Sequence, residues 1–339
     1  MTIVGAFRVK KTPVLIGDMA LMRGEIRSLR KKAYLISPNF VVAWSGYMIV
    51  AKTVISELKA KFGRRAPTRK EIEELLTRFD ESDFGRLHTN FIGWIIDHTG
   101  QHCFLWNCLY PKEVFYNDCY FEGTGEQYFD SMRREKESWQ SGGTGLPSED
   151  QPILHAINAV AKARFDESLY QKTWDLTFGA SYDILVFLRG RFQYIGSVIY
   201  LGWDYHWDSS RGTGRIQSAP VVIKHNCMGE FSILQEALQG PYFTGSVTNY
   251  LSRSVCDDMP GADLSRFQFR VDPQTDYFAN YFIFRGEDGR TVFKSLVAVR
   301  QPSGDGPLRI QQVASGAYFF DFDTQVLDQM YANHGPAGT

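Results

Sequence analysis

Short apolar runs separated by turn residues open the chain, and they restrict its first part to a β-rich structure. Each run is rich in β-branched or aromatic residues, which favour strands. The runs predict two hairpins, the first from residues 2–9 and 13–17 and the second from residues 32–37 and 40–45. The beginning of the chain is therefore expected to form paired antiparallel strands.

Two helices are predicted to follow these hairpins. After Gly46, apolar residues recur at helical spacing and predict a helix over residues 48–63. A second helix is predicted to begin at Thr68, because Glu71 three residues later completes a capping box, and to end near Phe79.

More strands and helices are predicted up to residue 200. Strands are expected at residues 90–97, 102–107, 113–116, 182–188 and 191–200, and helices at residues 125–134 and 151–165. This alternation of hairpins and helices predicts an α+β fold, a four-layer αββα sandwich with helices on both outer faces. A domain is accordingly expected over residues 1–202.

The remainder, residues 203–339, is predicted to be a C-terminal α+β extension of unknown role. It begins with an aromatic, Gly/Ser-rich stretch, and a change of composition near residues 200–225 marks the boundary. Its expected elements are a helix at 229–239, a hairpin at 277–299, a strand at 309–313 and a helix at 324–333.

Composition restricts the partners and the location. The net charge of −1 gives no electrostatic case for nucleic acid or an anionic membrane as a partner. No run approaches the roughly 20 apolar residues of a membrane span, and no signal-peptide pattern is present, so a cytoplasmic location is expected. The five cysteines form no Cys-x-x-Cys pair, and no metal or cofactor is expected. His98 and His102 flank a predicted turn and are expected to be surface residues.

The second residue has the chemistry of a nucleophile. Thr2 follows the initiator Met1, and methionine before a small residue is the usual substrate of methionine aminopeptidase. A chain that began with Thr2 would carry a hydroxyl and a free α-amine on one residue, a recognised way to activate a weak nucleophile.

The spacing of residues around Thr2 resembles proteasome β-subunits and HslV-type peptidases of the N-terminal-nucleophile hydrolase superfamily. Asp18 lies sixteen residues after Thr2, Lys32 is the second of a Lys-Lys pair, and Gly46 lies fourteen residues beyond it. The turn at 123–125 and the stretch 175–183 also resemble family segments. The resemblance covers roughly residues 2–200.

The resemblance implies a threonine-type peptidase or amidohydrolase that forms an acyl-enzyme without metal or cofactor. Thr2 would attack the carbonyl carbon, and Lys32, oriented by Asp18, would help the hydroxyl to lose its proton. The Gly46 N–H would face the oxyanion, and Asp175 would support the amine. A peptide or amide is the implied substrate. The resemblance also implies self-association, and it implies an ATP-dependent unfoldase as a possible partner.

Each residue also has a structural interpretation. Thr2 could be an ordinary strand residue, Lys31 and Lys32 two solvated charges, and Asp18 a turn cap. Glu126 and Phe178 stand where the family has serines that support the amine. The alternative hypothesis is therefore a non-catalytic, proteasome-like structural or interaction subunit.

Overall fold

The structure is a computed structural model of the 339-residue chain. It describes residues 3–23, 26–85, 87–123, 151–170, 181–218, 220–239, 244–257, 263–264, 267–272, 275–300, 306–312 and 318–334. Thr2, Glu126, Asp175 and Phe178 lie outside these residues, as does the predicted helix at 125–134.

The predicted four-layer αββα sandwich is wrong. The structure is mostly β, with 51% of it in strands and 19% in helices, and the strands divide among several sheets. The high strand content comes mainly from the residues beyond 196, where long strands form a separate sheet in place of the expected α+β extension.

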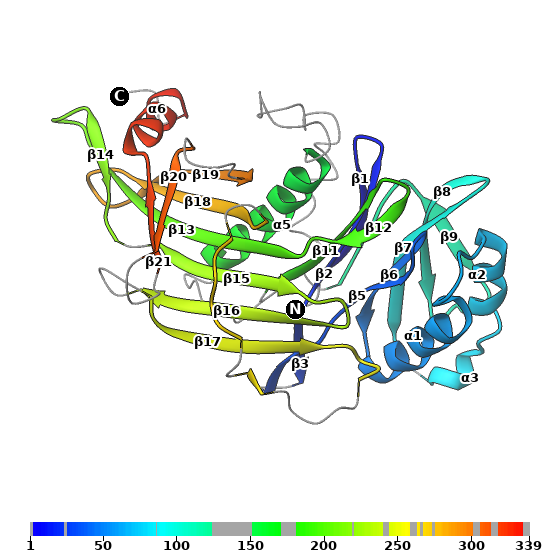
Figure 1. The fold of residues 1–339 in the computed structure, drawn as a ribbon. Helices are drawn as coiled ribbons and strands as arrows, with labels where there is room; N and C mark the ends of the chain where they lie inside the picture. The colour runs from blue at the N-terminus through cyan, green and yellow to red at the C-terminus, as the bar shows by residue number, and fades with distance from the viewer. Residues whose placement is uncertain are drawn as a thin grey trace. The chain divides into compact units, whose positions relative to one another are not determined.

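The chain divides into two compact units (Figure 1). The first comprises Met1–Gly196 together with two later pieces, Cys227–Ile233 and Leu251–Ala262, and the second comprises the rest. Sequence alone predicted a boundary after residue 202.

The first sheet of the first unit has five strands in the order β10-β1-β2-β11-β12. These strands are β1 (Val4–Val9), β2 (Thr12–Asp18), β10 (Tyr120–Glu122), β11 (Tyr182–Leu188) and β12 (Arg191–Tyr194). All pairs are antiparallel, and the β1–β2 register confirms the first predicted hairpin.

The second sheet of this unit is an antiparallel meander, β5-β6-β7-β8-β9. Its strands are β5 (Ala33–Ser37), β6 (Phe40–Gly46), β7 (Thr89–Asp97), β8 (Gly100–Asn107) and β9 (Val114–Asn117). Buried residues of both sheets share one core cluster, which includes Val4, Leu15, Val41 and Trp94. The two sheets therefore pack face to face.

Helices cover the other face of the second sheet (Figure 1). Helix α1 (Met48–Phe62) buries residues at helical spacing, among them Val50, Val54 and Leu58, against Phe40 and Trp44 of β6. Helix α2 (Arg69–Leu76) begins at the predicted capping box. The Thr68 side chain accepts from the Glu71 backbone, and the Glu71 carboxylate accepts from the Thr68 N–H.

The remaining short elements of the first unit are the β3–β4 hairpin (Ala20–Arg23 and Ile26–Leu29) and α3 (Glu81–Phe84). Helix α5 (Gln151–Tyr170) confirms the helix predicted at 151–165.

The second unit is built on a seven-stranded sheet with the path β17-β16-β15-β13-β18-β19, and β14 pairs with β13. The strands are β13 (Ser197–Asp208), β14 (Thr213–Ile216), β15 (Val221–Cys227), β16 (Phe231–Gln239), β17 (Thr244–Arg253), β18 (Tyr277–Arg285) and β19 (Thr291–Arg300). Its core also contains residues of the β20–β21 hairpin (Leu308–Gln312, Tyr318–Phe322) and of α6 (Thr324–His334).

The helix predicted at residues 229–239 is wrong, because this segment is strand β16. Its Leu, Gln, Glu and Ala residues favour a helix, but helix propensity is a weak preference that tertiary context overrides. Here the segment lies between β15 and β17 in the sheet.

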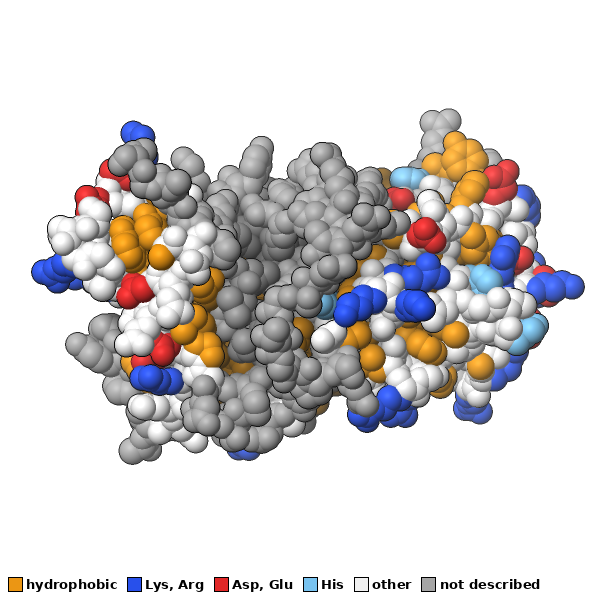
Figure 2. Space-filling view, turned by 90° about the horizontal axis from the view of Figure 1, so that it is seen from above, with side chains coloured by type: hydrophobic (Ala, Val, Ile, Leu, Met, Phe, Trp, Pro, Cys, Tyr) orange, Lys and Arg blue, Asp and Glu red, His pale blue; other side chains and the backbone are white. Residues whose placement is uncertain are grey.

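No helix in the described parts of the chain is both long enough and apolar enough to cross a membrane. On the face drawn in Figure 2, basic, acidic and apolar side chains are interspersed, in keeping with the small net charge.

Candidate functional site

Asp18 and Lys32, two site residues implied by the family resemblance, form a buried ion pair. Asp18 is the last residue of β2, and Lys32 directly precedes β5, so the two sheets of the first unit each contribute one partner. The Lys32 Nζ atom lies 2.6 Å from Asp18 Oδ1, and both side chains are 0% exposed. The structural interpretation of Lys31 and Lys32 as solvated charges is therefore wrong.

The same carboxylate holds the start of the first strand. The Ile3 N–H donates to Asp18 Oδ1 at 3.1 Å, and the Asp18 N–H donates to the Ile3 carbonyl at 3.0 Å. The nitrogen that donates to Asp18 is covalently bonded to the carbonyl carbon of Thr2. Asp18 is therefore hydrogen-bonded to the residue that follows the predicted nucleophile, and Lys32 binds the same carboxylate oxygen.

Asp18 keeps one oxygen without a hydrogen bond. Among the residues that the structure describes, the buried Oδ2 atom has no partner. Burial raises the pKa of the Asp18 carboxyl, while the Lys32 ammonium and the Ile3 N–H oppose this rise. A buried acceptor without a partner is costly, so this oxygen is suited to a further donor.

Lys31 forms a second buried pair beside the first. Its Nζ atom lies 2.8 Å from Asp183 Oδ2 and 3.2 Å from Ser232 Oγ, and the Lys31 and Asp183 side chains are 0% exposed. Ser232 in turn donates to Asp183 Oδ1 at 2.7 Å. The Cys227 thiol lies 3.4 Å from Nζ, and the Tyr194 ring centroid lies 4.4 Å from it.

The charges of this second pair stabilise each other. Burial disfavours the Lys31 ammonium, but Asp183 and Cys227 together outweigh burial through charge and hydrogen bonds and raise the pKa of Lys31. Burial also raises the pKa of Cys227 to about 12, so its thiol stays protonated at neutral pH. Sequence reasoning did not select Asp183, Ser232 or Cys227 as site residues.

Gly46 ends β6 in a conformation that suits glycine. Its φ angle is +125°, and a Cβ atom there would lie 2.3 Å from the His88 carbonyl oxygen. Gly46 pairs with Thr89 of β7, and the Thr89 hydroxyl accepts from the N–H of Tyr47 at 3.0 Å. Of the five predicted site residues, the structure brings Asp18 and Lys32 together. It places Gly46 at the end of strand β6 in the second sheet.

A hydrogen-bonded row of polar side chains lies near this end of the sheets. Asn90 donates to Glu122 Oε2 at 2.6 Å, and the Asn107 amide nitrogen donates to Asn90 Oδ1 at 2.6 Å. The same nitrogen lies 2.7 Å from His88 Nε2, so this imidazole nitrogen accepts the second amide proton. No sequence motif marked these residues, because they come from three separate segments.

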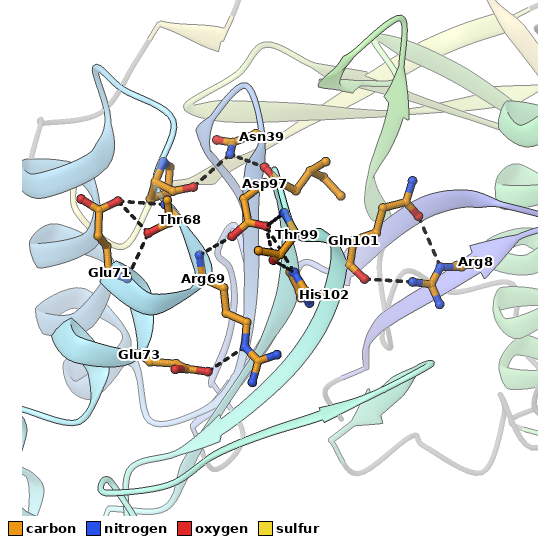
Figure 3. Close-up of polar contacts among 12 residues, drawn as sticks. Arg8, Asn39, Thr68, Arg69, Glu71, Glu73, Asp97, Thr99, Gln101 and His102 are labelled. Carbon is orange, nitrogen blue, oxygen red and sulfur yellow. Dashed lines mark hydrogen bonds and ion pairs between the residues drawn. The ribbon is translucent and has the colours of Figure 1, made fainter.

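A further polar cluster surrounds Asp97 at the end of β7 (Figure 3). Its carboxylate accepts from the Arg69 N–H at the start of α2, from the Thr99 N–H and hydroxyl, and contacts His102 Nε2 at 3.3 Å. These bonds lower the pKa of Asp97 even though burial opposes them. The cluster ties the β7–β8 turn to α2, and His102 takes part in it.

The described residues contain no group of three or more His, Cys, Asp and Glu side chains arranged to hold a metal ion. Models of known protein families do not match this sequence, and curated proteins of known function give no match either.

Proposed function

We propose that the chain is a threonine-type amide hydrolase or peptidase that uses Thr2, exposed by removal of Met1, as its nucleophile. The observation that carries this proposal is the buried Asp18–Lys32 pair, which is hydrogen-bonded to Ile3 and in which Asp18 Oδ2 has no partner among the described residues. The spacing that resembles proteasome β-subunits and HslV-type peptidases supports the same residues.

Each group has a definite task in this reaction. The Thr2 α-amine has an ordinary pKa of about 7.7–8.0, which suits a general base at neutral pH. The Thr2 hydroxyl attacks the amide carbonyl and passes its proton to the α-amine. The amide C–N bond then breaks, the departing amine takes this proton, and water later hydrolyses the ester of the acyl-enzyme. The Lys32 ammonium, held by Asp18, stabilises negative charge on the hydroxyl oxygen. Asp18 Oδ2 is suited to accept from the amine.

A second candidate function is a non-catalytic structural or interaction subunit. The observation that favours it is the complete burial of Asp18 and Lys32, since both side chains are 0% exposed. Fixing the packing of the surrounding elements can be the sole role of a buried, hydrogen-bonded ion pair.

The mass of the N-terminal peptide from protein made in cells separates the two functions. A mass lower by one methionine residue is expected for the hydrolase. A retained Met1 would block the α-amine of Thr2 and would exclude the hydrolase function. An electrophile that forms a ring with a 1,2-amino alcohol should label the mature protein and its Thr2→Ser variant. Labelling that persists in Thr2→Ala would contradict the role of Thr2, and Thr53→Ala on α1 is the control.

Self-association and a cytoplasmic location complete the proposal. Tyr47, Met48 and Ile49 at the start of α1 are 52%, 40% and 67% exposed, an apolar surface that supports packing against a second copy. The five cysteines are all free thiols, which supports a reducing compartment. Light scattering of the wild type and of Ile49→Asp tests the assembly, which the aspartate should weaken. An ATP-dependent unfoldase remains a proposal from the resemblance alone.

A further inference from the structure

Two hairpins of the first sheet end in basic turns. Strand pairing in β1–β2 extends to the residues on either side of Lys10 and Lys11, so these two lysines form the turn. In β11–β12 the turn consists of Arg189 and Gly190, and Arg191 follows it directly. Strands β2 and β11 pair antiparallel, so both turns lie at the same end of the sheet (Figure 1). Two strand spacings, roughly 10 Å, separate the backbone of β2 from that of β12.

The conformation of these turns does not account for their basic residues. Lys10 and Arg189, the first residue of each turn, have φ angles of 55° and 52°. They are the two non-glycine residues with a positive φ angle in the described parts of the chain. Glycine, asparagine and aspartate adopt this conformation most readily in hairpin turns. A lysine and an arginine at these positions therefore need an explanation other than turn formation.

The charges at this end of the sheet are exposed and are not neutralised. Lys10, Lys11 and Arg191 are all exposed. The Lys10 Nζ atom donates to the neutral side-chain carbonyl of Gln151 at 3.0 Å, and none of the three has an acidic partner among the described residues. Elsewhere in the same unit, exposed basic residues such as Arg65 are paired with a glutamate. The two turns therefore present positive charge to solvent.

We infer that Lys10, Lys11 and Arg191 form a basic surface that binds an acidic segment of another protein. Carboxylates suit this surface, because arginine binds them through two parallel hydrogen bonds and lysine binds them as a point charge. The exposed large apolar side chains of the described residues come from other elements, so this surface offers none for stacking on bases or for insertion into a membrane. Arg189 has another interaction and is not needed for the surface. The inference does not depend on the proposed hydrolase function.

The test titrates the full chain into a fluorescent peptide of consecutive glutamates and measures the anisotropy at low salt. Lys11→Gln and Arg191→Gln should each weaken binding by up to about fivefold, the upper range for one exposed ion pair. The charge reversal Lys11→Glu should weaken binding further, and added salt should weaken binding to the wild type. Lys70→Glu makes the same change of charge at an exposed lysine of α2, so it is the matched control and should not change binding.

The outcomes separate an acidic protein segment from other anions. Equal binding by the wild type and Lys11→Glu, or equal binding of a peptide of consecutive glutamines, overturns the inference. A single-stranded oligonucleotide of equal charge that binds more tightly, and loses this binding in Lys11→Glu, assigns the surface to nucleic acid and also overturns it. Thermal unfolding checks that each variant is folded. If the Arg191 variant does not fold, the comparison of Lys11→Glu with Lys70→Glu decides.

Discussion

The Nζ atom of Lys32 lies 2.6 Å from Oδ1 of Asp18, and neither side chain is exposed to solvent. The neighbouring lysine, Lys31, is bound just as deeply by a different aspartate, Asp183. These aspartates belong to adjacent strands, because Asp183 of β11 pairs with Gly17, the residue before Asp18 in β2. Two lysines in succession thus neutralise two acids inside the first unit.

The substitution Lys32→Met should destabilise the protein by about 3–5 kcal/mol, because it leaves Asp18 as a buried charge without its partner. Burial raises the pKa of Asp18 even in the presence of Lys32, and loss of the ammonium raises it further, so the variant loses additional stability as pH rises from the ordinary carboxyl pKa toward the folded-state pKa. The loss should therefore be larger at pH 7 than near pH 4. Urea denaturation at both pH values measures it, and the double variant Lys32→Met/Asp18→Asn should regain part of the stability. An equal loss at both pH values would contradict an ionised Asp18.

The substitution Ser232→Ala should cost about 1.5–3 kcal/mol, the usual range for a hydrogen bond to a charged group. The hydroxyl accepts from Lys31 and donates to Asp183, and both bonds are lost together. Urea denaturation measures the change. Ser56→Ala, at an exposed position of α1, is the control and should change stability much less.

The substitution Gly46→Ala should destabilise the protein more than Gly100→Ala. Both glycines have a positive φ angle, +125° and +138°, so both variants carry a backbone penalty. Only the new Cβ of Gly46→Ala would meet the His88 oxygen at 2.3 Å, whereas the nearest atom at position 100 is 4.0 Å away. The difference in thermal midpoint between the two variants isolates the steric clash. Equal midpoints would show that the segment at His88 can move away from the new Cβ with no loss of stability.

Glu71 should make the stability depend on acid pH. The Arg65 guanidinium and the Thr68 N–H lower the pKa of Glu71 to about 2, below its ordinary 4.5. A lowered folded pKa gives stability that is present above pH 4.5 and is lost as pH falls toward 2. The variant Glu71→Gln should lose this part of the pH dependence, measured as the difference in unfolding free energy from the wild type. Glu74→Gln on the same helix is the control.

Local signals in the sequence predicted much of the first unit. The Thr68–Glu71 capping box and the apolar spacing of α1 depend on residues a few positions apart, and the structure confirms both. The Asp18–Lys32 pair joins the two sheets of the first unit over fourteen residues, and the family resemblance implied this contact. The roles of Thr2 and Asp175 stay predictions.

Contacts between distant residues could not be predicted in this way. Lys31 meets Asp183 and Ser232 across 152 and 201 residues, and no local pattern encodes such partners. The same limit affected residues 229–239, whose composition favours a helix but whose place in the sheet makes them strand β16. The predicted fold was wrong for a related reason, since residues 203–339 were expected to form an α+β extension with one hairpin and one further strand, whereas the structure is mostly β and has a seven-stranded sheet there.

The bond from Ser232 to Lys31 has a consequence for synthesis on the ribosome. The first unit contains Cys227–Ile233, so its interior stays incomplete until these residues have been translated. At about 5–20 residues per second, the 201 residues from Lys31 to Ser232 take roughly 10–40 s to translate. During this interval Lys31 is made but Ser232 is not, so the interior of the first unit is expected to become complete only after Ser232 has left the ribosome.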